Sequence, residues 1–294
     1  MTDSTGARGA LLAFVAYASL SFGDAAVKGI GSNLPVFEIG FFASLFGALA
    51  VFFMRPGNER WREAFRMRHP WLVQARCLTG LSAGLLGIIA FTTIPFAEAY
   101  ALIFLAPFVV ILLSILLLGE RIGWLGWVAV CAGLLGALLV IRPGIKVLEW
   151  GHLAALGVAV MSGTTVIILR RIAATERRIS LLGMPYFYAV VLFGIATIPV
   201  FRMPNALEFA MMAGAGLLSA LGQLALLTAA KHAPASVVGQ AQYSQLLWAV
   251  LIGAVVYAEY PDAIAVAGLV IIAAAGILNV LRSRKAAPVP PAIP

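Results

Sequence analysis

The fold is decided by residues 94–121, which read IPFAEAYALIFLAPFVVILLSILLLGER. Between Glu98 and Glu120 this stretch carries no charged side chain. A helix needs about 20 mainly apolar residues to cross a bilayer. The stretch therefore predicts a membrane-spanning helix, with a proline-marked turn at its start and charges at its end.

The composition of the whole chain agrees with this interpretation. Of its 294 residues, 62% are hydrophobic and 11% are charged, against roughly 45–50% and 25% in soluble proteins. Apolar runs between charged, Pro or Gly positions predict ten helices, at 9–30, 34–54, 70–93, 96–118, 122–141, 150–171, 180–201, 207–230, 235–257 and 262–281. Ten such helices use roughly 200 residues. We therefore expect an all-α integral membrane protein with no soluble domain.

The basic residues indicate orientation. They outnumber the acidic residues by 20 to 12, but they lie in short gaps between apolar runs, which argues against a nucleic-acid partner. Lys and Arg are retained on the cytoplasmic side of short loops. With both termini inside, the inner segments hold 15 of the 20, namely Arg8, Arg55, Arg60, Arg62, Arg66, Arg68, Arg121, Arg170, Arg171, Arg177, Arg178, Lys231, Arg282, Arg284 and Lys285. We expect a multi-pass protein of a bacterial-type inner membrane with both termini in the cytoplasm.

Metal and redox chemistry have no support in the sequence. Cys77 and Cys131 lie inside apolar runs, and His69, His152 and His232 share no metal-ligand spacing. Phosphate-binding loops, nucleophile elbows and zincin motifs are also missing from the sequence. We expect no cofactor and no enzymatic activity.

The sequence repeats itself at an offset of 139 residues. The matching pairs are Pro95 with Pro234, Ala97 with Ser236, and Glu120 with Glu259. At the neighbouring offset of 142, Lys28 matches Arg170. Each half holds five helices, and because five is odd, the second half must cross the membrane in the opposite sense. This arrangement is an inverted-topology repeat.

The residues of this repeat carry a family resemblance. The junction at residues 94–99, the proline at Pro107 and the closing residues 117–121 resemble the motif of the drug/metabolite transporter superfamily, in its EamA-type branch. The second copy is degenerate, because Leu246 replaces the proline and Ala258 replaces Gly119. The chain as a whole resembles the aromatic amino acid exporters of that superfamily. The resemblance implies a ten-helix carrier with a central cavity, made of repeats at 1–146 and 147–285. The Ala/Pro-rich segment at 286–294 is expected to be a disordered tail.

Polar residues form one stripe on the first predicted helix. Tyr17, Ser21, Asp24 and Lys28 are spaced by 4, 3 and 4 residues, which places them on one helix face. Polar groups inside hydrocarbon cost several kcal/mol unless they are paired or hydrated. We predict that the stripe lines a substrate path, with Asp24 and Lys28 paired and meeting the two charges of a zwitterion. The alternative is that Lys28 reaches the membrane surface and Asp24 only neutralises it.

The ninth predicted helix has an unusually polar midpoint. Amides and a hydroxyl can hydrogen-bond an amino acid without carrying charge, and an indole can stack on an aromatic side chain. We predict a cavity wall here, whereas hydrogen bonding between helices is the alternative. The polar residues of this segment are Gln240, Gln242, Tyr243, Ser244, Gln245 and Trp248.

The remaining candidates lie on the helices expected to surround the same path. Pro107 removes a backbone hydrogen bond and is predicted to bend the fourth helix as a hinge, although such kinks can be static. Glu98 is interpreted as an interfacial residue, and Arg76 as a residue that reaches the surface or binds a carboxylate. The other predicted cavity residues are Tyr100, Thr79, Ser162, Thr165, Ser219 and Gln223. Two glycine sets, Gly80, Gly84 and Gly87, and Gly133 and Gly136, are expected to form packing faces.

The function expected from these features is secondary transport. The substrates are small amphipathic metabolites, most of all amino acids including aromatic ones, exported by alternating access. Efflux of cationic drugs or other metabolites is the alternative within transport, but it favours an embedded acid free of a cation, and Asp24 has Lys28 one turn away. A membrane enzyme or a structural membrane protein is the alternative from another class. The coupling ion and the oligomeric state stay open.

Overall fold

The computed structural model describes residues 2–53, 65–118, 123–142, 147–172, 175–232, 238 and 241–285. The described residues form helices and short connections, with no strand among them. Eight spans are long and apolar enough to cross a membrane, and two shorter apolar helices follow them. The predicted ten-helix, all-α membrane fold is thus confirmed. Gln240 and the expected tail at 286–294 lie outside the described residues.

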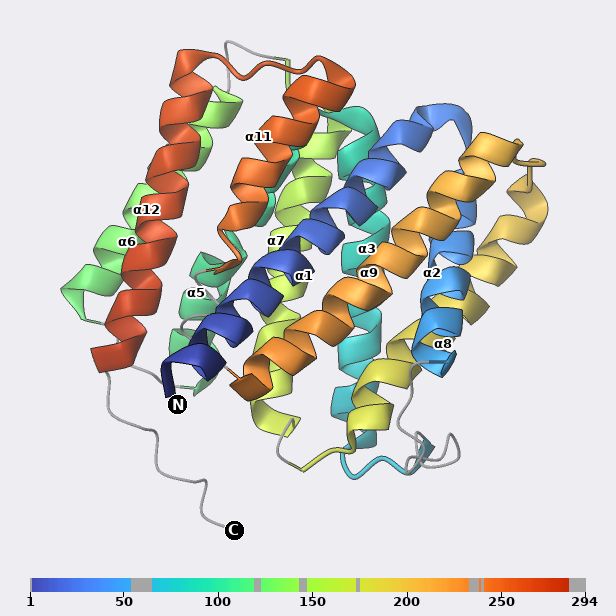
Figure 1. Cartoon of the computed structure of the whole chain (residues 1–294), viewed down its shortest axis with the longest axis horizontal. Coiled ribbons are helices and arrows are strands. Elements are labelled where there is room, and N and C mark those ends of the chain that lie inside the picture. The colour runs from blue at the N-terminus through green and yellow to red at the C-terminus, as the bar shows by residue number, and fades with distance from the viewer. Residues whose placement is uncertain are drawn as a thin grey trace.

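The spans follow the predicted order (Figure 1). α4 and α5 together make one span, Phe96–Leu117. The helices are α1 (Thr2–Ile30), α2 (Val36–Phe53), α3 (Pro70–Thr93), α4 (Phe96–Ile103), α5 (Ala106–Leu118), α6 (Trp124–Ile141), α7 (Trp150–Ile172), α8 (Arg178–Thr197), α9 (Ala206–His232), α11 (Ser244–Tyr257) and α12 (Ala263–Lys285).

The two halves of the chain interlock. α1 packs along α9, α3 along α7, and α6 along α12, so each pair joins one helix of the first half to one of the second. In Figure 1 the α6–α12 pair forms one edge of the bundle, and α2 with α8 forms the other. α4 meets α11 near the middle, as the repeat predicts for the fourth and ninth helices.

Contacts at one end of the bundle show that the halves run in opposite directions. Lys28, near the end of α1, and His152, near the start of α7, both contact residues beside the α3–α4 junction. α1 therefore runs toward this end and α7 runs away from it, as an inverted repeat requires. We name this end the Lys28 end. α1 begins and α12 ends at the opposite end (Figure 1).

The fourth span is interrupted in the turn that precedes Pro107. The break falls at Phe104 and Leu105, and Pro107 is the second residue of the helix that follows, where a missing N–H costs little. A turn at Gln242 and Tyr243 precedes α11 at the matching place in the second half, without a proline. The predicted bend in the fourth helix is therefore present, in the turn where the missing N–H of Pro107 interrupts helical bonding. The role of Pro107 as a hinge stays a prediction.

Two glycines let α6 and α12 cross closely. A Cβ atom added to Gly136 would lie 2.7 Å from the backbone oxygen of Gly268, and one added to Gly268 would lie 2.6 Å from the oxygen of Gly136. Gly133 is covered in the same way by the ring of Phe108. A Cβ atom added to Gly80 or Gly84 would meet no neighbouring atom of the described residues within 4 Å. The expected packing face on α3 therefore does not include these two glycines.

Candidate functional site

A polar cluster joins three helices inside the bundle. The hydroxyl group of Tyr100 on α4 donates a hydrogen bond to Oδ2 of Asp24 on α1 over 2.6 Å. The same hydroxyl oxygen lies 3.4 Å from Oγ of Ser21 and 3.5 Å from Nε2 of Gln245 on α11. Ser21, Tyr100 and Gln245 are buried, whereas Asp24 is partly exposed. We name these four residues the Asp24 cluster.

Asp24 has no cation beside it. Within the described part of the chain, no Lys, Arg or His nitrogen lies within 4.0 Å of its carboxylate. A carboxylate inside a bundle is costly unless a cation or a proton neutralises it. One short hydrogen bond from Tyr100 leaves most of its acceptor positions open. The cluster is therefore suited to a positively charged group with several N–H donors.

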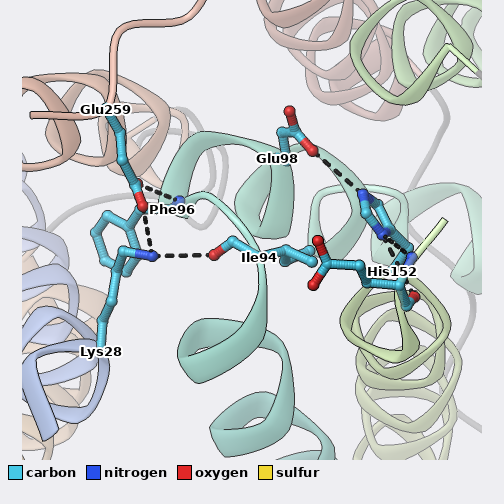
Figure 2. A network of polar contacts seen from close by, with 7 residues as sticks. Lys28, Ile94, Phe96, Glu98, His152 and Glu259 are labelled. Carbon is cyan, nitrogen blue, oxygen red and sulfur yellow. Dashed lines mark hydrogen bonds and ion pairs between the residues drawn. The ribbon is translucent and has the colours of Figure 1, made fainter. Parts of the chain in front are cut away.

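Lys28 pairs with a different acid. Its Nζ lies 2.7 Å from Oε1 of Glu259 and donates to the backbone oxygen of Ile94 over 3.0 Å (Figure 2). The expected Asp24–Lys28 pair is therefore wrong for this state of the protein. The side chain of Lys28 is only 10% exposed, so it does not reach the surface as the alternative supposed. Residues of the stripe on α1 therefore have different partners, because Asp24 bonds to Tyr100 and Lys28 pairs with Glu259.

The Lys28–Glu259 pair also completes two helix ends. Oε2 of Glu259 accepts the backbone N–H of Phe96, the first residue of α4, over 2.8 Å. Lys28 donates to the carbonyl group that follows α3. Helix termini leave such groups without partners inside the helix, and they favour an anion at the N-terminus and a cation at the C-terminus. Glu259, from the second half, thereby ties α1 to the α3–α4 junction.

A second buried pair lies at the same end. Nε2 of His152 on α7 lies 3.2 Å from Oε2 of Glu98 on α4 (Figure 2). Nδ1 of His152 accepts the backbone N–H of Glu149 over 3.0 Å, which places the ring proton on Nε2, facing Glu98. Glu98 is 8% exposed, so its side chain is buried at this end of the bundle. The histidine was missed because sequence spacing looks for metal ligands and not for a single carboxylate partner.

The predicted residues on α3 and α7 bond to each other. The hydroxyl groups of Thr79 and Thr165 lie 2.7 Å apart. Each also lies within hydrogen-bond distance of a carbonyl oxygen of its own helix, so one hydroxyl donates to its own helix and the other donates to its threonine partner. Ser162 lies one turn from Thr165, partly buried. This contact holds two helices together, whether or not it also borders a path.

The other predicted residues are not hydrogen-bond partners of the Asp24 cluster among the described residues. Ser219 of α9 packs against Gly23 of α1, and Gln223 is exposed. Tyr17 is buried, and Gln242 lies in the turn before α11. On α11 the indole N–H of Trp248 and the hydroxyl group of Ser244 are buried without a partner among the described residues. The Trp248 ring lies 5.7 Å from both Phe14 and Phe22 of α1.

The described residues border cavities at two places that the Asp24 cluster does not line. One of about 270 Å³ lies at the Lys28 end against Glu98, Glu259 and Asp262. The other, of about 280 Å³, is apolar and lies between α2 and α8, beside Phe52 and Tyr186. Glu259 lines the first cavity, and its partner Lys28 lies one helical turn from Asp24 along α1. We call this arrangement, with Lys28 paired to Glu259, the closed state.

Known proteins resemble the chain over most of its length. It is 30% identical over 276 residues to the pseudopaline exporter CntI of Pseudomonas aeruginosa, covering 92% of this chain and 94% of that protein. The S-adenosylmethionine uptake transporter of Rickettsia prowazekii is 24% identical, with 90% of each chain covered. A riboflavin transporter of Rhizobium johnstonii is 30% identical over 60% of this chain and 58% of its own.

The fold and the family agree. A solved crystal structure matches this chain at a TM-score of 0.66 and 18% sequence identity, with 97% of this chain and 99% of the solved chain aligned. At this identity the match shows a likeness of fold alone. The EamA-like transporter family matches twice, at residues 7–142 and again at 149–281. The chain therefore belongs to the EamA-like transporter family, within the drug/metabolite transporter superfamily, and is a multi-pass membrane protein that transports small metabolites.

Proposed function

We propose that the protein is a secondary carrier that exports small amphipathic metabolites bearing an ammonium group, amino acids including aromatic ones among them. The contact between Asp24 and Tyr100 carries this proposal. It places a carboxylate without a cation where helices of both halves meet, beside the hydroxyl group of Ser21 and the amide of Gln245. An ammonium group supplies both the charge and the donors that this carboxylate lacks.

Aromatic rings around the cluster support the aromatic part of the proposal. Tyr100 packs against Phe91, Phe96 and Phe104, with ring centroids 5.1 to 6.2 Å away. Aromatic pairs are worth about 0.5–1.5 kcal/mol beyond their buried area. This predicts a modest preference for aromatic over aliphatic substrates. Trp248 and Ser244 on α11, whose indole N–H and hydroxyl group lack partners among the described residues, are the candidates for further substrate contacts.

The orientation completes the proposal. The excess of Lys and Arg in the segments expected inside favours a cytoplasmic location for the end where α1 begins and α12 ends, so that the Lys28 end faces outward from a bacterial inner membrane. Alternating access then requires the Lys28 end to open while the opposite end closes, with the halves rocking around the Asp24 cluster.

Efflux of other organic cations is a second candidate function. Asp24 lacks a cation partner because Glu259 holds Lys28, and this removes the objection that the sequence raised. The relatives differ in both substrate and direction, since one exports pseudopaline and another takes up S-adenosylmethionine. The distinction depends on whether a carboxylate on the substrate is needed for transport.

Counterflow in proteoliposomes tests the proposed function. Vesicles containing the purified protein are loaded in turn with L-phenylalanine, L-alanine, S-adenosylmethionine, riboflavin or tetraphenylphosphonium, and uptake of the radiolabelled compound is compared with protein-free vesicles. We expect exchange of both amino acids, with phenylalanine preferred by about 2- to 12-fold if stacking contributes 0.5–1.5 kcal/mol. Exchange of tetraphenylphosphonium without either amino acid would favour the second candidate, and exchange of riboflavin alone would contradict both.

A further inference from the structure

We propose that Lys28 changes partner during transport. In the state described here it pairs with Glu259, and when the Lys28 end opens it pairs with Asp24, where it replaces the ammonium group of the departing substrate. This inference rests on the proposed function for the identity of the group that is replaced. The exchange of partners by Lys28, from Glu259 to Asp24, does not depend on the proposed function.

The closed state has three contacts that must break together. Glu259 follows directly after α11, held by its N–H bond to the carbonyl oxygen of Gly253. Its carboxylate binds Lys28 and the N–H of Phe96. The hydroxyl group of Tyr257, on the last turn of α11, donates to the carbonyl oxygen of Ala25. A motion that separates the end of α11 from both α1 and the start of α4 removes all of these contacts.

The second partner of Lys28 is already in place. Asp24 and Lys28 are four residues apart on α1, so their Cβ atoms are about 5–6 Å apart on one face of the helix. Lys28 can therefore reach Asp24 by changing side-chain rotamers, with no change in the backbone of α1. An acid that precedes a lysine by four residues is also the more favourable order of such a pair.

The two carboxylates differ in what they lose when the lysine leaves. Glu259 is 27% exposed and lies at the end of the bundle, where opening would hydrate it. Asp24 lies a turn deeper, against Tyr100, whose side chain is 2% exposed. Charges separated in water interact weakly, whereas an unpaired charge inside the bundle is costly. In the open state the pair with Asp24 is therefore the stronger one.

The exchange has a direct consequence for transport. Lys28 and the ammonium group of a substrate compete for the single negative charge of Asp24, so opening the Lys28 end favours release on that side. Once the substrate has left, Asp24 is still neutralised, and the empty carrier can close again. Lys28 is thus a positioning residue that competes with substrate in one state and leaves the site free in the other.

Thiol labelling distinguishes this exchange from a simple latch, without any substrate. The reporter is Ser21→Cys, at a position that is fully buried in the closed state, in a background where Cys77 and Cys131 are replaced by alanine. Its labelling by a membrane-impermeant maleimide from the Lys28 side measures the fraction of open protein. The variants compared in this background are Glu259→Gln, Lys28→Gln, Asp24→Asn and the double variant Glu259→Gln with Asp24→Asn.

The exchange predicts different results for the two members of one ion pair. Glu259→Gln removes only the closed-state pair, so labelling should rise by about 5-fold or more, a typical size for coupling between states. Asp24→Asn removes only the open-state pair, so it should lower labelling, and in the double variant it should reverse the rise. Lys28→Gln removes both pairs, so labelling should stay within about 2-fold of the parent, a shift below the usual coupling range.

A simple latch predicts that Glu259→Gln and Lys28→Gln raise labelling alike and that Asp24→Asn has no effect, and this pattern would overturn the proposal. Equal labelling in all variants would also overturn it. If Glu259→Gln fails to reach the membrane, Glu259→Asp replaces it, with a shortened side chain that should raise labelling in the same direction. Failure of the proposed function would appear in the counterflow panel and would leave this labelling pattern unchanged.

Discussion

Asp24→Asn should reduce counterflow of L-phenylalanine by about 30-fold or more, because removing one partner of a buried charge pair costs roughly 2–5 kcal/mol and each 1.4 kcal/mol is tenfold. Asparagine keeps the size of the side chain, and its carbonyl oxygen can still accept the Tyr100 hydroxyl group. The variant therefore removes the charge with little change in packing. Initial rates in proteoliposomes, normalised to reconstituted protein, give the measurement.

Asp262→Asn is the matched control. Asp262 pairs with Arg142 at the Lys28 end, and its Oδ1 accepts the N–H of Ala265 over 2.9 Å. Asparagine can keep that last bond, and exposed ion pairs are worth about 0–1 kcal/mol. We expect nearly normal transport. Equal loss in both variants would mean that acidic charge at this end supports the fold, and not that Asp24 binds substrate.

Gly136→Leu should prevent the close crossing of α6 and α12 and lower the thermal unfolding midpoint by about 5–10 °C, as expected if overpacking costs 1–3 kcal/mol. The new side chain would meet backbone atoms of Gly268 and Ile272, which cannot move aside as a flexible side chain could. The midpoint is measured on detergent-purified protein by following the monodisperse fraction after heating.

Gly84→Leu gives the comparison for this prediction. Gly84 lies inside α3 and is exposed, with nothing within 4 Å of an added Cβ atom. Leucine there adds the same side chain to a helix without a clash. Its unfolding midpoint should be close to that of the parent, and a similar fall in both variants would remove the α6–α12 crossing as the cause.

The sequence predicts the helices well because hydropathy alone requires them. The expected range 70–93 coincides with α3, and 34–54 differs from α2 by a few residues. The interruption of the fourth span was expected from Pro107, whereas that of the ninth span was not predicted. The break at Phe104 and Leu105 lies between apolar residues, so hydropathy does not change across it. Pro107 marks the first break in the sequence. The second half has its break at Gln242 and Tyr243 without a proline, so no residue type marks it.

The site was predicted only in part. Periodicity placed Ser21 and Asp24 on one face of α1, and the repeat brought α4 and α11 together, so the cluster around Tyr100 follows from those two signals. The partner of Lys28 did not follow. Asp24 was favoured because it lies four residues away, whereas Glu259 lies at the end of the second repeat, and only the folded chain brings it to α1.

The most direct test of ammonium recognition compares two compounds that each lack one charge of phenylalanine. An excess of 2-phenylethylamine, which lacks the carboxylate, or of 3-phenylpropanoate, which lacks the ammonium group, is added to L-phenylalanine counterflow in proteoliposomes. If Asp24 binds the ammonium group, the amine should inhibit counterflow strongly and the acid should not. Inhibition by 3-phenylpropanoate with none by 2-phenylethylamine would contradict recognition through Asp24.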